Sequence, residues 1–415
     1  MTFPQRLALM VLLALLCSLV PKYPAPAQNH AKEKTPQTGT TPAAKPEAAK
    51  EKDPDYSQEA VIIEKYKNVH RFEKEGTGRR ELTLRVKIQS DAGVQHFGQL
   101  VFPYTSANEK LNIDLLRVLK SDGNVVSGSQ SDVQDLTAPI AREAPIYTDI
   151  RQKHVTVKAL RPGDVLEYAV SWDIETPVAP NHFWLSHDFV SRDVIVLDEQ
   201  LEVNIPADSK VKIKTEAGLD PAIKEQDGRR IYSWKHSNLK RRTKEEEEEA
   251  RKKKLDLDDP KPPQIQMSTF QSWDEVGKWY AGLERDRVVA DEKIRAKAES
   301  LVQGLSTDKE KIEALYNYVA KNFRYVSLSL GQGRYQPHLA ADVLANQYGD
   351  CKDKHTLLAA MLSATGFRAY AALMNSTRKI DPDMPSPGQF DHVISAIPVG
   401  AETLWADTTA EVAPF

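Results

Sequence analysis

The sequence is poor in cysteine, in unbalanced positive charge and in long hydrophobic runs. Two cysteines in 415 residues exclude a scaffold held together by disulfide bonds. The 56 Lys and Arg residues are matched by 59 Asp and Glu, so no nucleic-acid partner is expected. With 28% charged and 40% hydrophobic residues, the composition excludes collagen-like and polytopic membrane proteins and is typical of soluble globular ones. The length predicts two or three domains.

The first 27 residues have the pattern of a secretory signal. Arg6 supplies a positive start, Leu7–Val20 is an apolar run of 14 residues, and Ala25–Ala27 offers a small-x-small cleavage site. The apolar run is too short to span a bilayer, which takes about 20 residues. We therefore expect cleavage, no integral membrane segment afterwards, and an exported protein that is periplasmic or secreted. Lipidation at Cys17 is the weaker alternative.

Cleavage would remove Cys17 and leave Cys351 as the single cysteine of the exported chain. A lone thiol cannot form an internal disulfide bond, and in an oxidising compartment thiols tend to pair or oxidise. Cys351 is therefore either buried and inert or retained for its reactivity.

The composition divides the chain into five segments. After the signal peptide (1–27), residues 28–55 contain no Val, Ile, Leu, Met, Phe, Trp, Tyr or Cys and predict a disordered linker. Residues 56–240 predict a β-sandwich domain of unknown function. Residues 241–267 predict a charged linker, because they contain five consecutive Glu, a run of Lys and several Pro. Residues 268–415 form the second domain.

Alternating apolar and polar residues predict strands in residues 56–240. The two-residue period is clearest in Glu81–Gln89 and again in Leu166–Trp172. The turn dipeptides Asp122-Gly123 and Pro162-Gly163 separate apolar runs. Short strands with regular turns favour a twisted antiparallel sandwich. Because no catalytic cluster or phosphate-binding loop occurs here, we interpret this half as a binding or scaffolding module.

After Ser268 the apolar residues follow a helical period, with stripes over Trp273–Leu283 and Ile312–Phe323. A further short helix is predicted over Ala340–Asn346. The glycine-rich segment Gly331–Arg334 lacks both the Lys of a P-loop and the spacing of a dinucleotide fingerprint. No nucleotide cofactor is therefore expected.

The residues around Cys351 predict the start of a helix. Asp350 is a preferred N-cap residue, and Asp353 stands at the third helical position, where it completes a capping box. Cys351 is then the first helical residue. The positive end of the helix, with Lys352 and Lys354 nearby, is expected to stabilise its thiolate form.

A nucleophilic thiol needs a base within hydrogen-bond reach and a third group that orients the base. His355 lies four residues after Cys351 on the same helix, but it shares the face of Leu358, which predicts a core position. His338 lies in a loop with no paired acid in its neighbourhood, so a helix-capping or surface role is expected for it.

His392 has more support as the base. Two strands are predicted around a turn between Val399 and Glu402, and their residues are 390–398 and 403–408. If Val399 pairs with Glu402, Asp407 is a diagonal neighbour of His392 on the same face, about 7 Å away at Cα. A register slip of one residue would send the two side chains to opposite faces.

These segments resemble the transglutaminase-like superfamily. The segments that carry the resemblance are Arg324–Val326, Gly331–Pro337, Tyr348–Lys354, Phe390–Val393 and Trp405–Thr409. The resemblance is strong over residues 320–410 and looser over 56–240, and it points to an exported bacterial branch with a β-rich N-terminal domain. It implies an α+β protein in which an N-terminal antiparallel β-sandwich precedes a papain-like core of helices packed on an antiparallel sheet.

The resemblance also implies the roles of three residues: Cys351 as nucleophile, His392 as general base and Asp407 as its orienting partner. It implies no metal and no other cofactor at the reaction centre. The chain stops eight residues after Asp407, whereas relatives usually continue, so we expect the domain to be truncated at its C-terminus.

Together these features predict a cysteine-dependent acyl transferase or hydrolase that acts on amide or peptide bonds through a thioester. Water as acceptor gives a peptidase or amidase, and an amine gives cross-linking; the residues do not decide between them. The substrate is expected to be a protein or peptide, for which the cell envelope is one source. The alternative is a non-catalytic envelope-binding protein that uses the core as an interaction module.

Overall fold

The computed structural model describes residues 55–410 except 143, 146–148, 191–192, 242, 244, 247, 250–261 and 327–333. The predicted signal peptide, nearly all of the linker 28–55, most of the charged segment and Gly331–Gly333 therefore lie outside the described residues.

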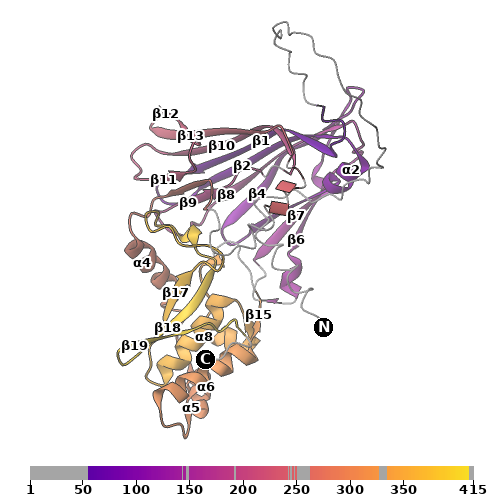
Figure 1. Ribbon diagram of the computed structural model, residues 1–415. Helices are drawn as coiled ribbons and strands as arrows, with labels where there is room; N and C mark the ends of the chain where they lie inside the picture. Colours follow the sequence, from indigo (N-terminus) through magenta and orange to yellow (C-terminus); the bar gives the residue numbers. More distant parts are fainter. Residues whose placement is uncertain are drawn as a thin grey trace, which may run out of the picture.

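A large sheet dominates the N-terminal half (Figure 1). In spatial order its strands are β12 (Ala222–Gln226), β13 (Arg229–Asn238), β10 (Ile195–Pro206), β1 (Val61–Phe72), β2 (Gly78–Ile88), β8 (Val165–Ile174), β4 (Glu109–Leu119) and β5 (Val125–Ser127). Neighbouring strands are antiparallel except β1 and β10, which are parallel. As the alternating pattern along β2 predicts, one face of this strand is buried: Leu84, Val86 and Ile88 are all in the core.

Two three-stranded sheets cover different parts of the large sheet. One consists of β3 (Gln99–Thr105), β7 (Ile150–Thr156) and β6 (Val133–Thr137), and the other of β11 (Lys212–Thr215), β14 (Ile265–Ser268) and β9 (Trp184–His187). Phe102 of β3 packs with Val86 and Trp172 in one core, whereas Met267 of β14 packs with Trp234 in another. The half is therefore a sandwich with two separate cores.

Strand β14 corrects the predicted end of the charged linker. Ile265–Ser268 is buried along its whole length and pairs with both β9 and β11. The prediction placed residues 265–267 in the linker because the apolar stretch is only a few residues long and follows the prolines directly. Tertiary pairing with two strands makes it part of the sandwich.

The C-terminal half packs helices on a small antiparallel sheet, which confirms the predicted α+β class. Its helices are α4 (Trp273–Glu284), α5 (Glu292–Val302), α6 (Asp308–Asn322), α7 (Ala340–Asn346) and α8 (Cys351–Ala364). Its strands are β17 (Tyr370–Met374), β18 (His392–Val399) and β19 (Glu402–Ala406), with β15 (Arg324–Tyr325) paired to β16 (Tyr348–Gly349). Helix α8 lies at the centre, with every residue from Lys352 to Leu362 buried. Within the described ranges, no helix has the length and apolarity needed to cross a bilayer.

An aromatic contact joins the two halves. Trp184 of β9 lies with its ring 5.7 Å from Trp279 of α4 and 5.5 Å from Tyr335, centroid to centroid. Gly388 approaches the same indole so closely that a Cβ there would stand 2.9 Å from Cδ1 of Trp184. Figure 1 shows α4 between the sandwich and the helices α5, α6 and α8.

The sandwich buries an ionisable side chain, Glu199 of β10. It has no exposed surface, and its two carboxylate oxygens each lie 3.0 Å from the donating backbone N–H of Val190. Burial raises the pKa of Glu199 to about 7 even though the hydrogen bond from Val190 opposes this shift. The folded state therefore favours the protonated carboxyl, and the stability from this group is present below the ordinary pKa near 4.5 and lost as pH rises through 7.

We expect Glu199→Gln to raise the free energy of unfolding by about 3 kcal/mol at pH 8, because the amide keeps an acceptor for Val190 without a buried charge. At pH 4 the two proteins should unfold at nearly the same urea concentration. Glu202→Gln, on the same strand and half-exposed beside Lys67, serves as the control and should change neither midpoint. An equal gain at both pH values would contradict the role of ionisation.

Candidate active site

Helix α8 begins at Cys351, as the sequence predicts. The Asp350 side chain accepts from the Asp353 backbone N–H at 3.2 Å, and the Asp353 side chain accepts from the Asp350 N–H at 3.3 Å. Both halves of the predicted capping box are therefore present. Cys351 is half-buried at the first helical position, where its backbone N–H has no acceptor within the helix.

The two lysines beside Cys351 are engaged in structural contacts. Lys352 is buried and forms an ion pair with Asp350. Lys354 is fully buried and donates to the carbonyl oxygens of Ala320 at 3.1 Å and Phe323 at 2.9 Å, at the end of α6. The Lys354 ammonium group thereby stabilises the negative end of α6, a contact that the sequence analysis did not assign. Such a contact depends on tertiary packing and leaves no local sequence signal.

The expectation that His338 has no acidic partner is wrong. Its Nδ1 lies 3.1 Å from both carboxylate oxygens of Asp353, and its backbone N–H donates to Oδ1 at 2.8 Å. Burial alone would lower the pKa of His338, but the hydrogen bond and charge of Asp353 raise it. The prediction missed this pair because the acid is 15 residues away along the chain. Asp353 therefore anchors the loop before α7 as well as the start of α8.

His355 lies in the core, as predicted. It is 1% exposed; its Nδ1 lies 2.7 Å from Ser395 Oγ and its Nε2 lies 2.7 Å from Glu284 Oε1. These contacts connect α8 to β18 and to α4. Because the ring is buried and its Nδ1 is bonded to Ser395, His355 is a structural residue of the core.

His392 and Asp407 meet at one end of the small sheet, where its central strand β18 begins and β19 has just ended. Strands β18 and β19 pair Val399 with Glu402 and continue to Ser395 with Ala406, which confirms the predicted register. The strands are shorter than predicted, so Asp407 follows the end of β19. His392 Nε2 lies 2.9 Å from Asp407 Oδ2.

Further groups hold Asp407 in place. Thr409 donates to Asp407 Oδ1 from its backbone N–H at 2.9 Å and from its hydroxyl at 2.7 Å, and Tyr316 donates to the Asp407 carbonyl oxygen at 3.0 Å. Burial alone would raise the pKa of Asp407, but hydrogen bonds from His392 and Thr409 lower it to about 2. The sequence analysis did not assign Thr409 and Tyr316 a role. A Thr two residues after an acid is a turn signal that was available for the first, and nothing local marks the second.

Cys351 is a second neighbour that acts on the His392 ring. Burial alone would lower the pKa of His392, but hydrogen bonds with Asp407 and with the Cys351 thiol, and the charges of both groups, raise it to about 10. Because Nε2 faces Asp407, Nδ1 is the ring nitrogen left for the sulfur. Both neighbours therefore favour the imidazolium form of His392.

The structure describes only part of the glycine-rich loop before α7. Gln332 and Gly333 lie outside the described residues, and the Arg334 guanidinium lies over the Tyr335 ring. In the described part of the chain, no three His, Cys, Asp or Glu side chains form a group that could hold a metal ion.

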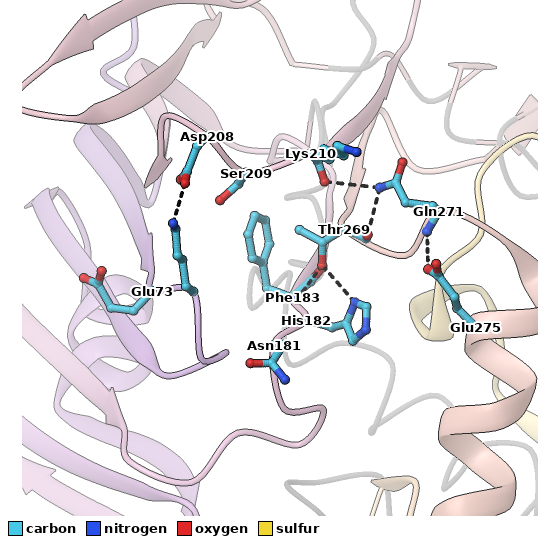
Figure 2. A pocket seen from close by; sticks show the side chains of 11 residues that line it. Glu73, Asn181, His182, Phe183, Asp208, Ser209, Lys210, Thr269, Gln271 and Glu275 are labelled. Carbon is cyan, nitrogen blue, oxygen red and sulfur yellow. Dashed lines mark hydrogen bonds and ion pairs between the residues drawn. The ribbon is translucent and has the colours of Figure 1, made fainter.

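A cavity of about 380 Å³ lies away from these residues, between the sandwich and α4 (Figure 2). The Thr269 hydroxyl contacts His182 and the Phe183 carbonyl there, and the backbone N–H of Gln271 donates to Glu275. Neither Cys351 nor His392 lines it, and many of its polar groups already have protein partners.

Two family models match separate parts of the chain, one within the sandwich and one within the helical half. Residues 74–243 match the model of a domain of unknown function, DUF3857. Residues 295–379 match the model of the transglutaminase-like superfamily, a match that includes Cys351 but ends before His392 and Asp407. No curated protein matches the sequence.

Among solved structures, a Parabacteroides distasonis protein described as "a putative protease" superposes with a TM-score of 0.69 at 15% identity, covering 86% of this chain and 68% of its own. A Cytophaga hutchinsonii protein described as "a putative cysteine protease" gives a TM-score of 0.26 at 13% identity, over 55% of this chain and 71% of its own. A zinc metallopeptidase from Deinococcus radiodurans gives 0.25 at 14% identity, over 43% and 39%. Only the first supports a shared fold.

We expect iodoacetamide to alkylate Cys351 almost as fast at pH 6 as at pH 8.5. The raised pKa of His392, about 10, keeps the imidazolium charged across this range and so stabilises the neighbouring thiolate. An unperturbed thiol would react roughly 100-fold more slowly at the lower pH. In His392→Ala that steep dependence should return. The measurement is mass spectrometry of the Cys351 peptide, with His154→Ala as a histidine control; a steep profile in the unsubstituted protein would contradict the prediction.

Proposed function

We propose that this chain, whose residues 295–379 belong to the transglutaminase-like superfamily, is an exported cysteine-dependent acyl transferase or hydrolase acting on amide or peptide bonds. The observation that carries the proposal is the chain of contacts from Cys351 through His392 to Asp407. A thiol, an imidazole and a carboxylate in this order match the demands of nucleophilic catalysis.

In the first half-reaction the Cys351 thiolate attacks the substrate carbonyl carbon. A C–S bond forms, and the carbonyl π electrons move to oxygen, where the Cys351 backbone N–H at the start of α8 stabilises the charge. Collapse of this intermediate breaks the C–N bond. The His392 imidazolium protonates the departing amine, which leaves a thioester and a neutral imidazole beside the Asp407 carboxylate.

The second half-reaction regenerates the thiolate. His392 removes a proton from water or from an acceptor amine as the oxygen or nitrogen attacks the thioester carbonyl. The C–S bond breaks, the acid or the new amide leaves, and the imidazolium–thiolate pair is restored. Asp407, fixed by Thr409, keeps the imidazole in one orientation throughout.

Protein or peptide substrates are the class that we propose. The Parabacteroides distasonis protein of the same fold is described as "a putative protease", which supports peptide bonds. Export to the periplasm or the medium is part of the proposal and rests on the sequence of residues 1–27. Substrates from the cell envelope would be accessible there.

We expect p-nitrophenyl acetate to acetylate Cys351 and to release a burst of p-nitrophenolate equal to the enzyme concentration. Cys351→Ala should give no burst and no acetyl-peptide. His392→Ala should acylate roughly 100- to 10,000-fold more slowly, because the thiolate loses its partner and the reaction its proton carrier. The control His154→Ala should match the unsubstituted protein. Equal acylation in all of these proteins would instead support the non-catalytic interaction module.

A further inference from the structure

Arg80 of β2 carries a charge that no carboxylate balances. The strands of the large sheet are described over their whole length, and every other arginine in them forms an ion pair with Asp or Glu: Arg71, Arg79, Arg85, Arg117, Arg229 and Arg230. The Arg80 guanidinium forms neither an ion pair nor a hydrogen bond with any described residue. It lies over the Trp172 ring, 4.0 Å from the ring centroid.

The strand register places Arg80 in a row of polar side chains. Antiparallel pairing aligns Arg80 with His70 of β1 on one side and with Trp172 of β8 on the other (Figure 1). Paired residues share one face of a sheet, with their Cβ atoms about 5 Å apart. Asn68 lies on the same face, two residues and roughly 7 Å from His70. Neither Asn68 nor His70 has a hydrogen-bond partner among the described residues.

This row lies between the two cores of the sandwich. Along the same face of β1, Tyr66 packs against the core that contains Phe102 of β3, and Phe72 belongs to the core that contains Met267 of β14. Asn68 and His70 stand between Tyr66 and Phe72. Both of them, and Arg80, are half-buried. The row is therefore flanked by apolar side chains and is still open to a ligand.

The row carries a single positive charge. Burial lowers the pKa of His70 to about 3, and the charges of Arg80 and His187 act in the same direction. The neutral imidazole offers one N–H donor, and the Asn68 amide offers more. The planar guanidinium fork matches the two oxygens of a carboxylate. A phosphate dianion would need a second cation, which the neutral His70 does not supply.

We propose that Arg80, His70 and Asn68 form a binding site for a carboxylate group. The Arg80 fork donates to both carboxylate oxygens, and the N–H groups of His70 and Asn68 donate to the same group. Only the choice of a peptide as carrier rests on the proposed function; in a peptide the group is the C-terminus or the side chain of Asp or Glu. Arg80 lies within residues 74–243, which match the domain of unknown function.

The test is a titration of the full chain with three peptides, in a Cys351→Ala background that prevents turnover. The peptides are acetyl-trialanine with a free C-terminus, its C-terminal amide, and an acetylated Ala-Glu-Ala amide. NMR of histidine labelled at Cε1 follows binding, with the His70 signal assigned by His70→Gln. We expect the His70 signal to shift, and trialanine amide to bind at least 10-fold more weakly than the better of the two acids. The better acid identifies the source of the carboxylate.

Substitutions at Arg80 test the assignment. Arg80→Gln should weaken binding of the better acid roughly 10- to 100-fold, and Arg80→Lys, which keeps the charge without the fork, by a smaller factor. Arg79→Gln is the matched control, because Arg79 is adjacent, faces the other side of the sheet and pairs with Glu81 and Asp173. It should leave the affinity unchanged. Urea unfolding checks each variant; if Arg80→Gln does not fold, Arg80→Lys decides.

Three outcomes would overturn the inference: equal binding of the acids and trialanine amide, unchanged affinity in the folded Arg80 variants, or tighter binding of inorganic phosphate than of either acid. Because binding is measured without the Cys351 thiol, any of them would leave the proposed function standing. Conversely, a protein that is not acetylated at Cys351 would still be expected to bind the carboxylate.

Discussion

The reciprocal hydrogen bonds between Asp350 and Asp353 determine where α8 begins. The candidate site depends on this starting position. They place Cys351 at the first helical position, with its N–H free of intrahelical bonding. Asp353 also binds His338, so one carboxylate fixes a helix start and the loop that precedes another helix. A start shifted by one residue would rotate Cys351 by about 100° around the axis, away from His392.

The charged side chains around the thiol mainly pair with one another or with backbone groups. Lys352 balances Asp350, Lys354 neutralises the end of α6, and His338 balances Asp353. Buried ions of this kind need close partners to offset the loss of hydration. Lys352 also interacts with the charge of Cys351, so the sulfur, the helix start and His392 belong to one electrostatic network.

What the sequence predicts well is local. The cap at Asp350, the strand period in β2 and the hairpin register from Val399 to Glu402 each follow from residues that are close in the chain. The pairing of His338 with Asp353 and the burial of Lys354 are tertiary contacts, and residue type and spacing do not encode them. The burial of β14 was missed for a related reason, since a four-residue strand becomes stable only between the neighbours that other segments supply.

The Trp184 indole links the unfolding of the two halves of the molecule. It packs on Trp279 and Tyr335. Separating the halves would expose these rings to water and remove the support of α4. Unfolding of either half would thus uncover apolar rings on the other, so this contact couples the stability of the sandwich to that of the helical half.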